Sequence, residues 1–190
     1  MSIELYVTTV LTKTKIRSKI LNRLKTHKEE DRDKKSRLVK KRLFRTSIFK
    51  KAKVIMFYIA LSGEVKTEEM IEAAKKLGKT VAVPICEHDR IIIRPCILTH
   101  RAKLRKGPYG ICEPAVKSFI DIKDLDLVIV PGLAFDKKGN RLGRGRGCYD
   151  HFLQRLPKDT PAIGLAYDFQ ILPSVPATAT DIKVNKVIFA

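Results

Sequence analysis

The side chains best suited to chemistry gather in one short segment, GNRLGRGRGCYD, which covers residues 139–150 and follows the apolar run 126–132. Its centre alternates arginines with glycines: Arg141, Gly143, Arg144, Gly145, Arg146 and Gly147. Guanidinium groups match the geometry of phosphate oxygens, while glycines reach backbone conformations closed to other residues and let an anion approach the main-chain N–H groups. The segment therefore predicts a cradle for a polyphosphate, with a flexible basic surface turn as the simpler alternative.

The spacing of the glycines separates this segment from two other phosphate loops. No Gly-Lys-Ser/Thr follows, as a Walker A loop requires, and the glycines run G-x-G-x-G instead of the G-x-G-x-x-G of dinucleotide-binding loops. A short helix is predicted over 148–157, ended by Pro157, and its positive dipole end would face the same place. The segment is thus expected to join a strand to a helix.

Two carboxylates are candidates for a metal site beside the cradle. Asp150 falls in the first turn of the predicted helix, where a carboxylate often only caps free N–H groups. The alternative is that it binds Mg²⁺, which nucleotide sites hold with one or two carboxylates plus phosphate oxygens and water. Asp181 could join it from the other end of the chain, and the sequence leaves open whether the two converge.

Short apolar runs separated by helical or loop segments predict the elements that position these residues. The expected strands cover 54–60, 80–86, 91–97, 126–132, 162–169 and 186–189, and a helix is expected over 67–79, with Thr67 as N-cap and Gly78 at its end. Nearly continuous apolar strands are typical of parallel sheets covered by helices on both faces. Ligands of such sheets bind at the carboxyl ends of the strands, where the glycine-arginine segment falls.

The N-terminal region carries most of the positive charge. Residues 1–53 hold 18 Lys and Arg against five Asp and Glu, a net charge of +13 out of +19 for the chain. Apolar residues recur there at helical spacing, which predicts two amphipathic basic helices between about residues 13 and 53, with KEEDRDKKS as a turn or a helix start. The positions expected to face inward are Ile16, Ile20, Leu24, Leu38, Leu43, Phe44 and Ile48. Such charge indicates an anionic partner, either nucleic acid or a phosphate-rich ligand.

Length and composition narrow the class of protein. The 190 residues, 44% of them hydrophobic, suit one α/β domain spanning 1–190. There is no apolar run long enough for a membrane span and no secretory signal, so a cytoplasmic location is expected. The four cysteines form no CxxC pair, which argues against a zinc site or a disulfide framework. Reduced thiols are the expectation.

Beyond these patterns, the chain resembles the 5-formyltetrahydrofolate cyclo-ligase family, also called 5,10-methenyltetrahydrofolate synthetase. Residues 131–153, PGLAFDKKGNRLGRGRGCYDHFL, are very similar to the central motif of that family. Other stretches agree in order: KTKIR (13–17), YIALSGEVKTEEMI (58–71), GKTVAVPI (78–85), YGICEP (109–114) and DIKVNKVIF (181–189). Residues 1–12 have no evident counterpart and are interpreted as an extra N-terminal segment. One departure is Cys148, where the family usually has a tyrosine.

The resemblance implies a three-layer, open, mainly parallel sheet of Rossmann-like type and an ATP- and Mg²⁺-dependent reaction. In that reaction 5-formyltetrahydrofolate is closed to 5,10-methenyltetrahydrofolate through a phosphorylated formyl intermediate, and ADP and phosphate are released. The implied partners are ATP and 5-formyltetrahydrofolate, with or without a polyglutamate tail. The implied enzyme is a monomer that binds no membrane and no specific nucleic acid.

The resemblance also assigns roles to particular residues. Lys13 and Arg17 match an ATP-binding pair, Asp150 and Asp181 match the Mg²⁺ positions, and Ile59 and Glu64 match folate contacts. The implied ATP-binding loop consists of Arg141, Leu142, Gly143, Arg144, Gly145, Arg146, Gly147, Cys148 and Tyr149, of which residues 144–148 also contact the folate substrate. Arg144 is the residue expected to stabilise the transferred phosphoryl group.

Two other functions remain open on the residues alone. One is a basic nucleic-acid-binding protein without catalysis, although aromatic residues are scarce between 13 and 53 and no known nucleic-acid motif is present. The other is a kinase or nucleotidyl transferase acting on a different small acid.

Overall fold

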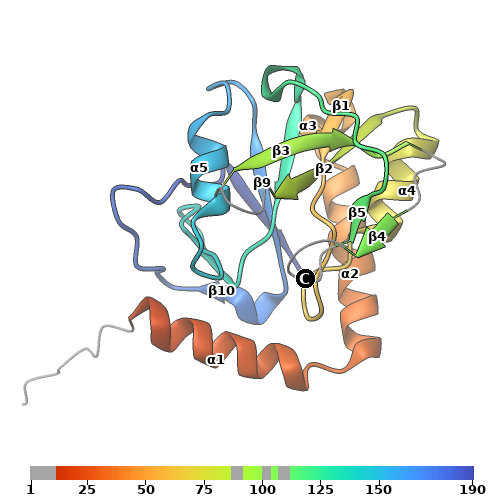
Figure 1. Cartoon of the computed structure of the whole chain (residues 1–190). Coiled ribbons are helices and arrows are strands. Elements are labelled where there is room, and N and C mark those ends of the chain that lie inside the picture. The colour runs from red at the N-terminus through yellow and green to blue at the C-terminus, as the bar shows by residue number, and fades with distance from the viewer. Residues whose placement is uncertain (1–11, 87–91, 100–103, 107–111) are drawn as a thin grey trace, which may run out of the picture.

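The apolar runs form a six-stranded sheet in the order β11-β9-β6-β1-β2-β3 (Figure 1). The structure is a computed structural model that describes residues 12–86, 92–99, 104–106 and 112–190. The strands are β1 (Val54–Met56), β2 (Thr80–Cys86), β3 (Ile93–Ile97), β6 (Leu127–Val130), β9 (Ala162–Ala166) and β11 (Lys186–Phe189). All neighbouring strands are parallel except β2 and β3. The predicted mainly parallel sheet is confirmed.

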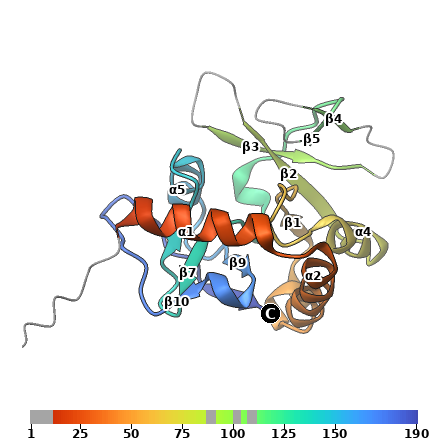
Figure 2. The ribbon, with the colours of Figure 1, turned by 90° about the horizontal axis from the view of Figure 1, so that it is seen from below.

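Helices cover both faces of this sheet (Figure 2). They are α1 (Lys13–Thr26), α2 (Glu29–Phe44), α3 (Ser47–Lys51), α4 (Glu68–Lys76) and α5 (Cys148–Gln154). In β6, Leu127 and Ile129 belong to the hydrophobic cluster that includes α1 to α4, whereas Val128 and Val130 belong to the cluster that includes α5. The period of two follows from strand geometry, because successive side chains point to opposite faces. The three-layer arrangement is therefore confirmed.

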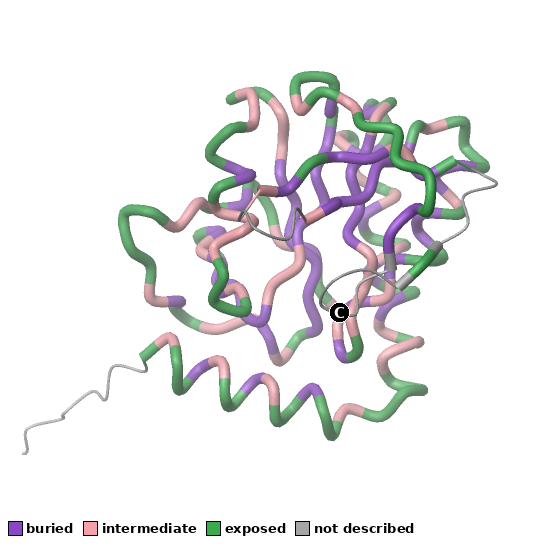
Figure 3. The backbone as a smooth tube through the Cα atoms, in the orientation of Figure 1, coloured by how far each residue is buried: buried purple, intermediate pink, exposed green. Residues whose placement is uncertain are grey.

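Residues 13–53 form three helices where the sequence predicted two. Ile16, Ile20 and Leu24 are buried once per turn of α1, as predicted (Figure 3). The segment KEEDRDKKS proves to be a helix start, with three acidic residues in the first turn of α2, where they complement the helix dipole. Leu38 was expected to face inward but is 42% exposed. The inward register of α2 instead runs through Ser36, Val39 and Leu43, while Phe44 and Ile48 are half-buried.

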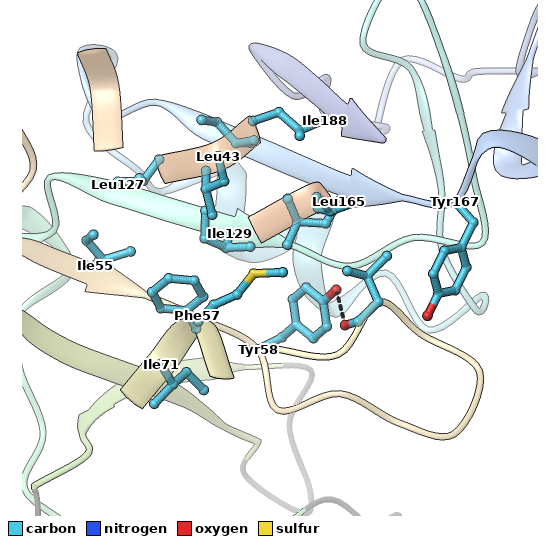
Figure 4. Packing of buried hydrophobic residues seen from close by; sticks show 14 of the residues in the cluster. Leu43, Ile55, Phe57, Tyr58, Ile71, Leu127, Ile129, Leu165, Tyr167 and Ile188 are labelled. Carbon is cyan, nitrogen blue, oxygen red and sulfur yellow. Dashed lines mark hydrogen bonds between the residues drawn. The ribbon is translucent and has the colours of Figure 1, made fainter. Parts of the chain in front are cut away.

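The strand predicted over 54–60 ends at Met56, and a loop follows it up to α4. Side chains hold this loop in place of a strand ladder: the Tyr58 hydroxyl donates to the carbonyl of Val65 at 2.9 Å (Figure 4), and the Thr67 hydroxyl donates to the carbonyl of Tyr58 at 2.7 Å. Thr67 occupies the N-cap position of α4, but its side chain does not cap the helix. Gly78 follows the end of α4 with a φ of 75°, as a helix stop requires.

Smaller elements that the sequence did not predict complete the fold. A second sheet has the order β10-β7-β8, formed by β10 (Ile171–Leu172), β7 (Ala134–Asp136) and β8 (Arg141–Leu142). β4 (Leu104–Lys106) and β5 (Cys112–Pro114) pair as a separate two-stranded sheet, and the described residues also form the 3₁₀ turns η2 (Ile122–Asp124) and η3 (Asp168–Gln170). The strands predicted over 126–132 and 162–169 end earlier, and α5 stops at Gln154, ahead of Pro157.

Some expectations fall on residues outside the described ones. These are the N-terminal segment up to residue 11, the first residue of the strand predicted over 91–97, and part of the YGICEP stretch. Cys86, Cys96 and Cys148 are free thiols, as expected. Among the described residues, no helix is long and apolar enough to cross a membrane.

Two glycines fix the second sheet to the first. A Cβ atom on Gly132 would lie 2.5 Å from Cζ of the Phe135 ring, and one on Gly164 would lie 2.5 Å from Cε1 of the same ring. Phe135, in β7, is completely buried. The ring thus occupies the space that side chains at both positions would need, which brings β7 onto β6 and β9.

We predict that Gly164→Ala lowers the free energy of unfolding by about 1–3 kcal/mol, because the added methyl overpacks a filled core. Equilibrium unfolding in urea measures this. Phe135→Leu combined with Gly164→Ala should cost less than the sum of the two single changes, because the smaller side chain makes room for the methyl. If the two losses in unfolding free energy are additive, the Phe135 ring is not the group that the added methyl contacts.

Candidate active site

The glycine-arginine loop does not follow β6 directly, because the β7–β8 hairpin comes between them. Asp136 holds this hairpin: its carboxylate accepts hydrogen bonds from the backbone N–H groups of Lys138 and Asn140, from the Asn140 amide and from the N–H of Val175. Burial tends to raise the pKa of Asp136, but these hydrogen bonds lower it below the usual range. The carboxylate is therefore ionised and fixed, and β8 leads from it into residues 143–147.

The three loop glycines serve different purposes. Gly145 and Gly147 have φ values of 110° and 70°, which glycine adopts without strain. Gly143 was expected to need such a conformation as well, but its φ is not positive. A Cβ atom there would lie 2.9 Å from an NH1 nitrogen of Arg141, so a side chain at this position would displace the end of that arginine.

Arg141 and Asp150 form a largely buried ion pair behind the loop. The Arg141 NH2 group donates to Oδ1 of Asp150 at 2.9 Å, and the side chains are 3% and 19% exposed. The backbone N–H of Ile182 donates to the same oxygen at 3.2 Å. Among the described residues, the Nε atom of Arg141 has no hydrogen-bond partner. Arg141 thus faces inward rather than solvent, and Asp150 accepts hydrogen bonds from Arg141 and Ile182 rather than from N–H groups of α5.

Lys13 and Asp181 join the two ends of the chain beside this pair. The Lys13 ammonium donates to Oδ2 of Asp181 at 2.5 Å, and the N–H and hydroxyl of Thr178 donate to the same oxygen. Burial tends to raise the pKa of Asp181, but the hydrogen bonds from Lys13 and Thr178 lower it. Because Ile182, next in sequence, bonds to Asp150, the two predicted metal-binding aspartates lie on adjoining segments.

The carboxylate oxygens of these aspartates suit a magnesium ion whose other ligands are phosphate oxygens. In the described part of the chain, Oδ2 of Asp150 and Oδ1 of Asp181 accept no hydrogen bond. No cluster of three or more His, Cys, Asp or Glu side chains occurs among these residues, so a cage made of protein ligands alone is absent there. Mg²⁺ in nucleotide sites needs only one or two carboxylates, with phosphates and water as the other ligands.

Arg144 and Glu64 meet across the loop. The Nε and NH2 groups of Arg144 donate to Oε1 of Glu64 at 3.2 and 3.1 Å, and the N–H of Leu61 donates to Oε2 at 3.0 Å. The Arg144 side chain is 42% exposed, whereas that of Glu64 is 10% exposed. Burial raises the pKa of Glu64, although the bonds from Leu61 and Arg144 oppose this. The residue expected at the phosphoryl group is therefore paired with the residue expected at the pterin.

Arg17 reaches the same loop from α1. Its Nε donates to the carbonyl of Gly143 at 3.0 Å, and its guanidinium carbon lies 3.7 Å from where a Cβ atom of Gly145 would be. Figure 2 shows α1 running across the molecule between α2 and α5. Lys13 and Arg17 thus approach the site one helical turn apart on α1.

The remaining predicted residues differ in their exposure. Leu142 lies in the core with 1% exposure, and Ile59 is half-buried against the same hydrophobic cluster. Arg146 is exposed. The Tyr149 hydroxyl is buried without a hydrogen-bond partner among the described residues, and burial raises its pKa. Cys148 is half-buried near Cys86, whose pKa burial raises to about 11.

Sequence reasoning missed the residues that support Glu64. The Tyr167 hydroxyl donates to the Glu64 carbonyl at 3.0 Å and contacts the Ser36 hydroxyl at 3.3 Å. Tyr58 and Thr67 hold the same loop, as described above. The apolar surroundings of Tyr167 and Tyr58 made them look like core residues, and only their hydroxyl groups could have signalled a second role.

Comparisons with known proteins agree with this arrangement. The model of the 5-formyltetrahydrofolate cyclo-ligase family matches residues 10–190. The chain is 30% identical to 5-formyltetrahydrofolate cyclo-ligase of Mus musculus over 194 residues, with 96% of each protein covered. It is 32% identical to the enzyme of that name from Haemophilus influenzae over 146 residues, which cover 73% of this chain and 76% of the relative.

Solved structures show the same fold. The NMR structure of Aquifex aeolicus 5,10-methenyltetrahydrofolate synthetase superposes with a TM-score of 0.82 at 32% identity, covering 93% of this chain and 89% of that one. The Mycoplasma pneumoniae protein of the same name has a TM-score of 0.76 at 22% identity, covering 93% and 97%. With the family match over nearly the whole chain, this likeness establishes that the chain belongs to the 5-formyltetrahydrofolate cyclo-ligase family of enzymes.

Proposed function

We propose that this protein closes 5-formyltetrahydrofolate to 5,10-methenyltetrahydrofolate in a reaction that cleaves ATP to ADP and phosphate. Family membership supports the overall conversion. The observation that carries the proposal is the contact between residues of separate segments, Arg144 with Glu64 and Lys13 with Asp181. These contacts bring cations suited to ATP next to carboxylates suited to a pterin and a metal.

The chemistry explains why ATP is needed. The formyl oxygen is a poor leaving group. It therefore first attacks the γ-phosphorus of ATP, while the bond from phosphorus to ADP breaks. N10 of the folate then attacks the activated formyl carbon and loses its proton. The C–O bond to the phosphate breaks, its electron pair leaves with phosphate, and the five-membered ring is closed.

The chain's own residues supply positioning and positive charge for these steps. Lys13, Arg17 and the loop backbone hold the phosphates of ATP, and Arg144 stabilises the charge on the phosphoryl group during transfer. Glu64 accepts hydrogen bonds from the amino and ring N–H groups of the pterin, and Ile59 contacts its apolar surface. The contacts of the folate with residues 144–148 complete the site.

Asp150 and Asp181 are the residues that would hold Mg²⁺, each through the oxygen that accepts no hydrogen bond in the described part of the chain. The ion would neutralise phosphate oxygens of ATP. Lys13, whose ammonium donates to Asp181 in this structure, would then be available to bind the nucleotide.

The charge of α1 suits anionic substrates. Lys15 and Lys19 are exposed there, near Lys13 and Arg17. They would attract ATP and the polyglutamate tail that folates can carry. We further propose that the protein acts as a monomer in the cytoplasm.

Mixing the protein with 5-formyltetrahydrofolate, ATP and Mg²⁺ should produce the near-ultraviolet absorbance of 5,10-methenyltetrahydrofolate, with none formed when ATP is omitted. Arg144→Ala should lower kcat by about 10²–10³-fold, the usual cost of removing one donor to a charged transition state. Arg45→Ala, which changes an exposed arginine at the end of α2, serves as the matched control. Full activity of Arg144→Ala would remove it from the reaction, and RNA binding without ATP turnover would favour a nucleic-acid-binding protein.

Asp150→Asn and Asp181→Asn should each raise the Mg²⁺ concentration that gives half-maximal activity by at least about tenfold, a change that loss of even an outer-shell partner can cause. A magnesium titration of the rate measures it, and excess EDTA should abolish turnover. Asp159→Asn, in an exposed turn, is the control. A lower kcat with unchanged magnesium dependence would mean that Asp150 and Asp181 only position Arg141 and Lys13.

A further inference from the structure

Glu64 and Arg144 each have a role in the proposed function that their contact with one another prevents. Glu64 is the carboxylate for the pterin, and Arg144 is the guanidinium for the transferred phosphoryl group. Yet two N–H groups of Arg144 occupy Oε1 of Glu64 at 3.2 and 3.1 Å. Before both residues can act, either the two side chains must separate, or Glu64 must bind Arg144 and the pterin at the same time.

The bonding capacity of Glu64 favours separation. A carboxylate offers about four acceptor positions, and here Arg144 takes two on Oε1 while the N–H of Leu61 takes one on Oε2 at 3.0 Å. A pterin that presents an amino group and a ring N–H side by side binds best when each donor has its own oxygen. That arrangement requires Oε1, which Arg144 occupies.

Arg144 is the partner that is able to move. Its side chain is 42% exposed and stands between Gly143 and Gly145, which impose little restriction on the backbone. Glu64 is 10% exposed, and its main chain is held by the Tyr167 hydroxyl at 3.0 Å. A pair with one well-exposed partner is weak enough to exchange.

A second constraint decides when the exchange takes place. A largely buried carboxylate without a donor is unfavourable, so Arg144 leaves readily only when other donors replace it. The N–H groups of the pterin are such donors. Arg144 therefore leaves Glu64 when the folate binds.

We propose that Glu64 restrains Arg144 until the pterin forms its own hydrogen bonds with the Glu64 carboxylate. Pterin binding then releases the Arg144 guanidinium for the phosphates of ATP. This inference rests on the proposed function. It makes Glu64 a positioning residue for phosphoryl transfer as well as a contact to the folate. It also couples the two binding sites and limits cleavage of ATP when no folate is bound.

The test measures the affinity for AMP-PNP, a nonhydrolysable ATP analogue, by calorimetry in the presence of Mg²⁺. In the wild-type protein, 5-formyltetrahydrofolate should tighten AMP-PNP binding by about fivefold or more, the usual lower size of coupling between two sites. Glu64→Gln should show about the same gain without folate, because an amide does not retain the guanidinium, and folate should then add nothing.

Glu69→Gln is the matched control, since it also removes one negative charge. Glu69 is exposed in α4 and paired with Lys40 of α2, so the AMP-PNP affinity of the Glu69→Gln protein should equal that of the wild type. In an Arg144→Ala background, Glu64→Gln should change nothing. A gain that persists without Arg144, or a Glu64→Gln protein that binds AMP-PNP no better than the wild type, would overturn the proposal.

Arg144→Ala alone supplies a test that needs no Glu64 variant, so poor folding of Glu64→Gln would not prevent a decision. Folate should no longer tighten AMP-PNP binding in this protein, and persistent coupling would refute the restraint. Failure of the proposed function looks different, because the wild-type protein would then neither bind nor convert 5-formyltetrahydrofolate. The proposed release of Arg144 by a pterin would then be refuted as well. Tighter AMP-PNP binding by the Glu64→Gln protein would still show that Glu64 restrains Arg144.

Discussion

One buried carboxylate, Asp136, determines whether the loop that carries the arginines has a fixed position. A buried charge is stable only when hydrogen bonds replace the water it has lost, and four donors do so here. They come from the turn after β7 and from Val175 near the C-terminal end, so satisfying one carboxylate ties distant parts of the chain together. Gly139 completes the turn, since a Cβ atom there would lie 2.2 Å from the carbonyl oxygen of Val184.

Ion pairs within the chain balance the positive charge of the site. Lys13 of α1 and the loop residues Arg141 and Arg144 contribute positive charge to the site, and their mutual repulsion would oppose folding if each lacked a counterion. Asp181, Asp150 and Glu64 supply these counterions. The same three carboxylates are the ones proposed to bind metal and pterin, so in this proposal ligand binding exchanges internal ion pairs for contacts with the ligands.

The sequence was sufficient to predict the layers of the fold, because β2 is a nearly continuous apolar run and the buried residues of α1 recur at helical spacing. It could not reveal the β7–β8 hairpin, whose strands are too short for any periodicity. Nor could it show that the strand predicted over 54–60 ends at Met56, because Phe57 and Tyr58 stay buried in the loop that follows, and the N–H of Phe57 still donates to the carbonyl of Ala82 in β2. The partners of Arg144 and Lys13 lie 80 and 168 residues away, and no local pattern encodes such contacts.

The ion pair of Lys13 with Asp181 has a consequence for how the protein is made. A ribosome releases Lys13 long before it adds Asp181, and β11, the strand that completes one edge of the sheet, is added later still. In a nascent chain the proposed nucleotide site therefore stays incomplete until the segment that carries Asp181 emerges. A copy cut off before Asp181 would consequently lack one part of the proposed nucleotide site.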